Sequence, residues 1–106
     1  MIHQLAAVDK RAKIGKNVVV EPFTTIAADV EIGEGTWIGS NVTIMDGARI
    51  GKNCKIFPGT VISAIPQDLK FEGEDTQTII GDNTTLRECV TVNKGTKALG
   101  YTKVGE

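Results

Sequence analysis

The sequence repeats every six residues. An aliphatic side chain occupies each sixth position from Ile2 to Ile62, and the same register resumes at Ile80. Helices repeat their apolar positions every 3.6 residues and strands every two, so neither element explains this period. A fixed short period predicts a solenoid of stacked coils, and it constrains the fold more than any other feature. The other positions of the series are Val8, Ile14, Val20, Ile26, Ile32, Ile38, Ile44, Ile50, Ile56, Leu86, Val92 and Val104.

The remaining positions of the hexad are also regular. A small or slim side chain follows four residues after each aliphatic one, as at Thr24 and Thr36. Glycine often comes directly after the aliphatic residue, as at Gly33 and Gly51, which predicts a positive φ or a close backbone approach. Each hexad therefore offers one large and one small inward residue. This pattern predicts an all-β fold, a parallel β-helix whose coils are stable only when stacked.

Composition narrows the class of protein. A length of 106 residues predicts one domain or part of one, and a formal net charge of −1 does not favour nucleic acid or an anionic membrane. We find no signal peptide and no membrane-spanning run, so we expect a cytoplasmic protein. Cys54 and Cys89 have no metal or disulfide spacing. We expect Cys54 to fill the core and Cys89 to be a free, partly exposed thiol.

The repeat is interrupted over residues 63–79. Asp68 and Glu74 stand there at positions that call for aliphatic side chains. We expect an inserted loop that projects from the solenoid, and insertions in repeat proteins often form the binding face. The alternative is a solvated bulge without function. The chain ends just after Val104 opens a new hexad, so we expect the β-helix of residues 1–106 to be incomplete at its C-terminus.

Several motifs carry a resemblance to a known family. They are Pro66-Gln67-Asp68-Leu69-Lys70-Phe71, Ile80-Gly81-Asp82-Asn83, Arg87-Glu88-Cys89-Val90-Thr91-Val92 and Gly95-Thr96. With the hexads, they make the whole chain resemble the N-terminal portion of the UDP-N-acetylglucosamine O-acyltransferases, a family of hexapeptide-repeat acyltransferases. The resemblance implies a left-handed parallel β-helix with triangular coils, a handedness that is an exception to the usual crossover rule. The family's helical C-terminal domain is not in this sequence.

The resemblance also implies a reaction. Members of the family move an (R)-3-hydroxyacyl group from acyl carrier protein to the 3-hydroxyl of UDP-N-acetylglucosamine in lipid A biosynthesis. They act as homotrimers, with sites between subunits and no metal or cofactor. The family's general-base histidine lies beyond Glu106, so we expect no catalytic residue within this chain and no activity from it alone. Gln67, Asp68 and Lys70 match loop positions that contact the sugar nucleotide and the acylated product.

Two residues depart from the family pattern. His3 is the only histidine, and we expect it to be a surface residue in the first hexad. Asn93 stands where the family often has histidine, which bears on contacts with the acyl donor. A basic cluster near the start of the chain is expected to be a solvated face, with carrier-protein contact as the alternative. This basic cluster consists of Lys10, Arg11, Lys13 and Lys16.

Other functions compete with this interpretation. A non-catalytic hexapeptide-repeat scaffold and a sister acyltransferase both share the hexads, although the N-acyltransferase of the same pathway usually has an extra N-terminal domain. A γ-class carbonic anhydrase needs three histidine ligands, which this sequence lacks. An ice-binding solenoid requires outward rows of threonine, whereas threonines such as Thr24 and Thr60 fall at the inward position.

Overall fold

The computed structural model describes residues 1–64, 77–88, 91–93 and 101–104. Within these ranges the chain forms short parallel strands in three sheets and no helix. Sheet I contains β1 (Ala7–Val8), β4 (Thr25–Ile26), β7 (Thr43–Ile44), β10 (Val61–Ala64) and β13 (Thr91–Asn93). Sheet II contains β2 (Lys13–Ile14), β5 (Glu31–Ile32), β8 (Ala48–Ile50), β11 (Gln77–Ile80) and β14 (Tyr101–Val104). Sheet III contains β3 (Val19–Val20), β6 (Trp37–Ile38), β9 (Lys55–Ile56) and β12 (Thr85–Leu86).

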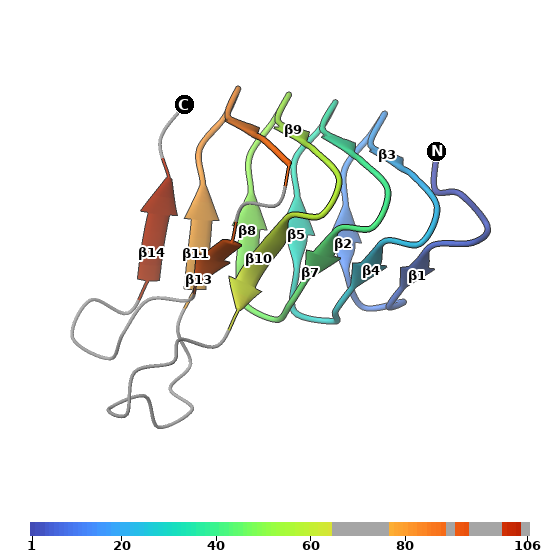
Figure 1. Ribbon diagram of the computed structural model, residues 1–106, viewed down its shortest axis with the longest axis horizontal. Helices are drawn as coiled ribbons and strands as arrows, with labels where there is room; N and C mark the ends of the chain where they lie inside the picture. Colours follow the sequence, from blue (N-terminus) through green and yellow to red (C-terminus); the bar gives the residue numbers. More distant parts are fainter. Residues whose placement is uncertain (65–76, 89–90, 94–100, 105–106) are drawn as a thin grey trace.

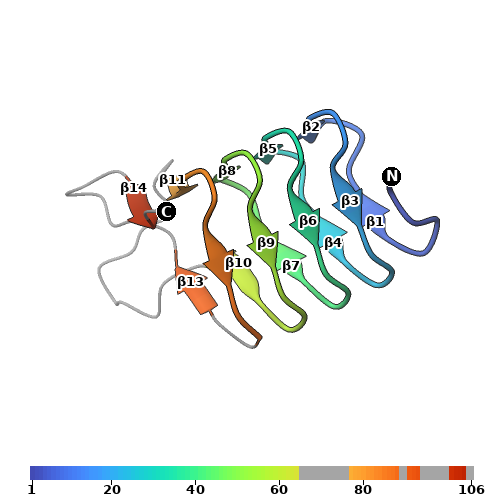
Figure 2. The same ribbon diagram turned by 90° about the horizontal axis from the view of Figure 1, so that it is seen from above.

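Each coil of the solenoid contributes one strand to each sheet. Figure 1 shows the coils stacked along the long axis, and Figure 2 shows the same stack from above. Equivalent residues of neighbouring coils pair in register, as Ile26 pairs with Ile44 and Ile44 with Ile62. Because the register is the same in every sheet, the inward residues form continuous columns. The predicted parallel β-helix is confirmed.

The aliphatic positions of the hexad form the core. Ile38, Ile56 and Ile62 have no exposed surface, whereas Ile2, in the first coil, is 46% exposed. Burying a branched aliphatic side chain stabilises the fold by about 1.5–3 kcal/mol, which no coil gains alone. Cys54 is fully buried at the small inward position, so its predicted role as core filler is confirmed.

The inward threonines are hydrogen-bonding residues as well as small ones. Thr36 Oγ1 donates to the Gly51 carbonyl at 2.8 Å and accepts from the Cys54 amide at 3.1 Å. Thr24 makes the same pair of bonds two corners earlier, to Gly39 O at 2.6 Å and from Val42 N at 3.2 Å. Each hydroxyl therefore satisfies two backbone groups of the next coil that would otherwise be buried without a partner.

For the glycines after the aliphatic positions, the sequence predicts either a positive φ or a close backbone approach, and the structure shows the close approach at Gly33. A Cβ on Gly33 would lie 2.7 Å from the carbonyl carbon of Gly51, so the close backbone approach is confirmed. The alternative, a positive φ, does not occur at Gly33 but two residues later, at Gly35 with φ of 77°. Asparagine or glycine occupies most such corners, since these residues tolerate the left-handed conformation best. The asparagines concerned are Asn17, Asn41, Asn53 and Asn83.

We predict that Thr36→Val destabilises the fold by about 2–3 kcal/mol, because it leaves a buried carbonyl and a buried amide unpaired. Thr85→Val is the matched control, since Thr85 points outward on β12 and is exposed. That variant should change stability by no more than about 0.5 kcal/mol. Urea unfolding followed by circular dichroism measures both effects. Equal midpoints for the two variants would contradict the role assigned to the inward hydroxyl.

Candidate functional site

The predicted insertion leaves the solenoid at the corner between sheets I and II. Strand β10 ends at Ala64 and β11 begins at Gln77. Residues 63–64 and 77–79, at the two ends of the predicted insertion, therefore lie in strands. The predicted substrate-binding residues fall between these strands and outside the described residues. They are Gln67, Asp68 and Lys70.

Ser63 marks the point at which the chain departs from the repeat. Ile62 pairs with Val92 but Ala64 pairs with Asn93, so Ser63 is an extra residue that forms a β-bulge. It has a φ of 66°, its side chain is buried, and its Oγ donates to the Asp46 carbonyl at 2.7 Å. Bulges are common next to functional sites, where they redirect the chain. The local sequence gives no signal for this bulge, because serine occupies a hexad position that varies from coil to coil, with Ala27 and Met45 at the equivalent positions of sheet I.

Neighbouring coils hold both ends of the insertion. On the earlier coil, the Gly47 carbonyl accepts a hydrogen bond from the Thr78 amide at 2.9 Å. On the later coil, the backbone of Asn93 lies beside Ala64 and that of Tyr101 beside Gln77. Asn93, the residue that departs from the family pattern, is therefore next to the exit of the insertion. His3 is not, because it precedes β1 and three strands of sheet I separate it from this exit.

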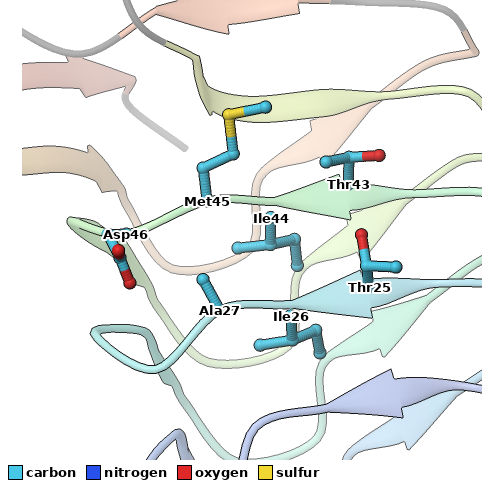
Figure 3. Close-up of a pocket in the computed structure, with 7 residues that line it drawn as sticks. All are labelled: Thr25, Ile26, Ala27, Thr43, Ile44, Met45 and Asp46. Carbon is cyan, nitrogen blue, oxygen red and sulfur yellow. The ribbon is translucent and has the colours of Figure 1, made fainter.

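A shallow hollow lies on the outer face of sheet I, one coil before this exit. Its volume is about 390 Å³, and Figure 3 shows its side chains. They are Thr25, Ile26, Ala27, Thr43, Ile44, Met45 and Asp46. Asp46 is the only charged residue among them, and its Oδ1 accepts a hydrogen bond from the Asp29 amide at 2.9 Å. The hollow therefore suits an apolar or uncharged group rather than an ion.

Sheet II has a charged outer face. Lys13, Glu31 and Arg49 stack in register along it. Arg49 lies 2.7 Å from the Asp29 carboxylate and 3.5 Å from that of Glu31. Opposite charges are thus paired within the chain, and this arrangement does not favour an ion-binding site.

The basic cluster near the start of the chain is exposed, as predicted. Arg11 Nε lies 3.1 Å from the Asp9 carboxylate, and this hydrogen bond lowers the pKa of Asp9 below its ordinary value. Carrier-protein contact by the cluster stays a prediction. His3 is partly exposed, and its Nδ1 accepts a hydrogen bond from the Leu5 amide at 3.1 Å.

Three further expectations concern metal binding, the thiol of Cys89 and membrane-spanning segments. No group of three histidine, cysteine, aspartate or glutamate side chains is placed to bind a metal in the ranges that the structure covers. Cys89 lies outside those ranges. No helix in the same part of the chain is long and apolar enough to cross a bilayer.

Threonines occur on the outer face of sheet I in addition to the inward ones. Thr25 and Thr43 are neighbours in register, but Val61 separates them from Thr91. The neighbouring outward positions are Ala27 and Met45 rather than a second row of threonines. The outer face of sheet I therefore does not favour ice binding.

We predict that Ser63→Ala destabilises the fold by about 0.5–1.5 kcal/mol, because the partly buried hydrogen bond to the Asp46 carbonyl is lost. Ser63→Gly loses the same hydrogen bond but accepts the positive φ without the cost of about 1 kcal/mol that a side chain bears. The glycine variant should therefore be the more stable of the two, which reverses the usual order within strands. Urea midpoints decide this, and a less stable glycine variant would contradict the strain assigned to Ser63.

Comparisons with known proteins agree with this geometry. Residues 29–64 match the family described as bacterial transferase hexapeptide (six repeats). The Chlorobium phaeobacteroides acyl-[acyl-carrier-protein]–UDP-N-acetylglucosamine O-acyltransferase is 57% identical over 98% of this chain and 39% of its own length. The enzyme of the same name from Sulfurovum is 55% identical over 98% of this chain and 40% of its own length. This chain therefore spans about two fifths of the relatives that it matches.

Solved structures show the same fold. The UDP-N-acetylglucosamine acyltransferase from Bacteroides fragilis superimposes with a TM-score of 0.97 at 52% identity, over 99% of this chain and 41% of that one. The Francisella novicida enzyme gives 0.94 at 45% identity, over 99% and 39%. The left-handed parallel β-helix implied by the resemblance is thereby confirmed.

Proposed function

We propose that this chain belongs to the UDP-N-acetylglucosamine O-acyltransferase family of hexapeptide-repeat proteins and that the protein is such an acyltransferase. It transfers an (R)-3-hydroxyacyl group from acyl carrier protein to the 3-hydroxyl of UDP-N-acetylglucosamine, the first step of lipid A biosynthesis. The observation that supports this proposal is 57% identity over 98% of the chain to a relative of that name. Because the chain spans only 39% of that relative, the proposal concerns the whole protein.

The chemistry requires three functions from the complete site. A general base removes the proton from the sugar hydroxyl, and the oxygen then attacks the thioester carbonyl. A hydrogen-bond donor stabilises the oxyanion of the tetrahedral intermediate, which collapses with release of the carrier thiol. The resemblance to the family implies that the base is a histidine beyond Glu106, and His3 lies in the first coil, away from the insertion. We therefore expect residues 1–106 alone to be inactive.

This chain supplies part of the acceptor site. The Asp68 carboxylate accepts hydrogen bonds from sugar hydroxyls, and the Lys70 ammonium donates to phosphate or carbonyl oxygens as a compact charge. Gln67 offers an amide that both donates and accepts. The buried bulge at Ser63 supports this role, because it fixes the direction in which the chain leaves sheet I. The sugar nucleotide then lies at the corner between sheets I and II.

The proposal includes partners and a compartment. The acyl donor is acyl carrier protein, the protein is a homotrimer with sites between subunits, and it acts in the cytoplasm without a metal or cofactor. A non-catalytic scaffold would bind no UDP-N-acetylglucosamine. A sister N-acyltransferase would transfer the acyl group to an amino sugar in preference to the hydroxyl. Assays with hydroxyl and amino acceptors separate these alternatives.

We predict that Asp68→Ala in the full-length protein lowers kcat/KM for UDP-N-acetylglucosamine about 10–100-fold, which corresponds to about 1.4–2.7 kcal/mol of transition-state stabilisation. Glu72→Ala is the matched control, because it removes a carboxylate from the same insertion at a position outside the family motif. Steady-state acyl transfer measures both. Equal rates for the two variants would overturn the role of Asp68. Turnover by residues 1–106 alone would overturn the need for a histidine beyond Glu106.

A further inference from the structure

The exposed apolar side chains of this chain gather at one end of the stack. Figures 1 and 2 show the N-terminus at that end. We refer to residues 1–18, the first full turn of the solenoid, as the terminal coil, since Ile2 pairs with Val20 and Ala7 with Thr25. Of the five large apolar side chains that are exposed among the described residues, four lie in the terminal coil or directly beneath it. They are Met1, Ile2, Leu5 and Phe23.

Positive charge is concentrated in the same coil. Residues 1–18 contain four basic side chains and one acidic one, whereas the rest of the chain contains eight basic and twelve acidic side chains. The formal net charge of −1 for the whole chain therefore conceals a net charge of +3 at this end and −4 elsewhere. The four basic residues are those of the basic cluster, and all are exposed. No ion pair among the described residues involves Lys10 or Lys16.

Charged and apolar groups share the end face of the terminal coil. Lys10 and Arg11 lie at the corner between β1 and β2, and Lys16 lies at the corner between β2 and β3. Leu5, which is 55% exposed, lies at the third corner. Between the corners the inward residues are only partly buried, because no described coil covers them. These inward residues are Ala6, Val8, Ala12 and Ile14.

Phe23 extends the apolar surface, although the fold does not require an aromatic residue there. It has a φ of 66°, and Asn41 and Gly59 occupy the equivalent positions of the next two coils. A bulky residue in this left-handed conformation is a genuine outlier. The Phe23 amide donates to the Leu5 carbonyl at 3.2 Å, so Phe23 lies directly beneath Leu5. Because its side chain is 61% exposed, burial within the chain does little to offset this strain.

We propose that the terminal coil, together with Phe23, is a docking surface for an anionic lipid bilayer. Exposed apolar side chains among lysine and arginine are typical of segments that lie at a membrane interface, where the cations are attracted to anionic headgroups. Charges at two corners and an apolar side chain at the third extend over the whole end of the solenoid, so a broad anionic surface contacts all three at once. The acidic remainder of the chain favours an end-on orientation, since a bilayer repels it.

The backbone limits how deeply the terminal coil can enter. Strands β1 and β2 are the first strands of their sheets and have a partner on one side only. The Ala7 and Asp9 amides donate to the next coil at 2.8 and 3.0 Å, so the peptide groups of Val8 face the open end. Peptide groups without partners are excluded from hydrocarbon. The terminal coil therefore stays among headgroups and water, and only side chains such as Leu5 and Phe23 reach the acyl chains.

Vesicle co-sedimentation of the full-length protein tests the charges. Binding to vesicles of phosphatidylcholine and phosphatidylglycerol in equal amounts should be at least about 10-fold tighter than binding to phosphatidylcholine alone. Lys10→Glu/Lys16→Glu should weaken binding to the mixed vesicles at least about 10-fold and retain the β-sheet circular dichroism spectrum. Lys52→Glu/Lys55→Glu is the matched control, because both lysines are exposed and Lys52 occupies the position of Lys16 two coils further on. Equal losses in the two variants, or equal binding to the two kinds of vesicle, would overturn the proposal.

Substitution of Phe23 tests the apolar contribution. Phe23→Asn should weaken binding to the mixed vesicles about 5-fold, because an apolar side chain no longer enters the interface. The fold should be retained, since Asn41 has the same backbone conformation one coil further on. Phe23→Tyr is the control, because it keeps the ring at the same position and should keep the affinity. Wild-type affinity in Phe23→Asn would overturn the role of Phe23 in docking.

Salt and a second partner complete the test. Raising sodium chloride from about 0.1 M to about 1 M should release the protein from mixed vesicles, because the Debye length falls from about 10 Å to about 3 Å. Binding that is indifferent to salt would overturn the proposal. Loss of carrier-protein binding in Lys10→Glu/Lys16→Glu, without vesicle binding by the parent protein, would show that the terminal coil docks an acidic protein and would also overturn it.

The inference goes beyond the proposed function and does not rest on it. Acyl transfer is measured with soluble substrates in the absence of vesicles. An active protein that does not bind mixed vesicles overturns the docking surface and leaves the proposed function standing. A protein without acyl transfer that binds mixed vesicles through Lys10 and Lys16 supports the docking surface and overturns the proposed function.

Discussion

Backbone hydrogen bonds between successive coils are the constraint on which the rest of this molecule depends. Strands of two to four residues are too short to be stable singly, and here each pairs in parallel with a strand of at least one neighbouring coil. This pairing fixes which residues stack, so that Ile26, Ile44 and Ile62 form one buried column. Hydrophobic burial then follows from register. A coil without its neighbours would lose the backbone hydrogen bonds and the burial of its aliphatic side chains together.

The corners are the second constraint, because three turns per coil must bend a backbone whose polar groups face a dry interior. Two devices solve this problem. Asparagine or glycine adopts the left-handed conformation that the bend requires, and threonine hydroxyls such as that of Thr36 pair with the buried carbonyl and amide of the next corner. Phe23 and Ser63 adopt the same left-handed conformation although neither is asparagine or glycine. Ser63 does so at the start of the insertion, whose residues have a proposed role in substrate binding.

The period of six was sufficient to predict the solenoid, its inward columns and the buried Cys54, because periodicity follows directly from burial. Details of backbone geometry could not be predicted in the same way. Glycine at Gly33 indicates either a positive φ or a close approach, and only the packed coils decide between them. The bulge at Ser63 depends on pairing with a strand 30 positions away, which the local sequence does not reveal. Gln67, Asp68 and Lys70 were assigned through resemblance, and their roles stay predictions.

The spacing of the paired strands has a consequence for how this protein can evolve. Thr43 and Val61 pair 18 positions apart, whereas Val61 and Thr91 pair 30 apart, with the insertion absorbing the difference. A deletion inside any ordinary coil would shift every later column out of phase. Between Ala64 and Gln77 the chain is held at both ends, so its length and composition can drift without that penalty. Under the proposed role of this segment in substrate binding, mutations that change substrate preference can accumulate there while the scaffold is inherited intact.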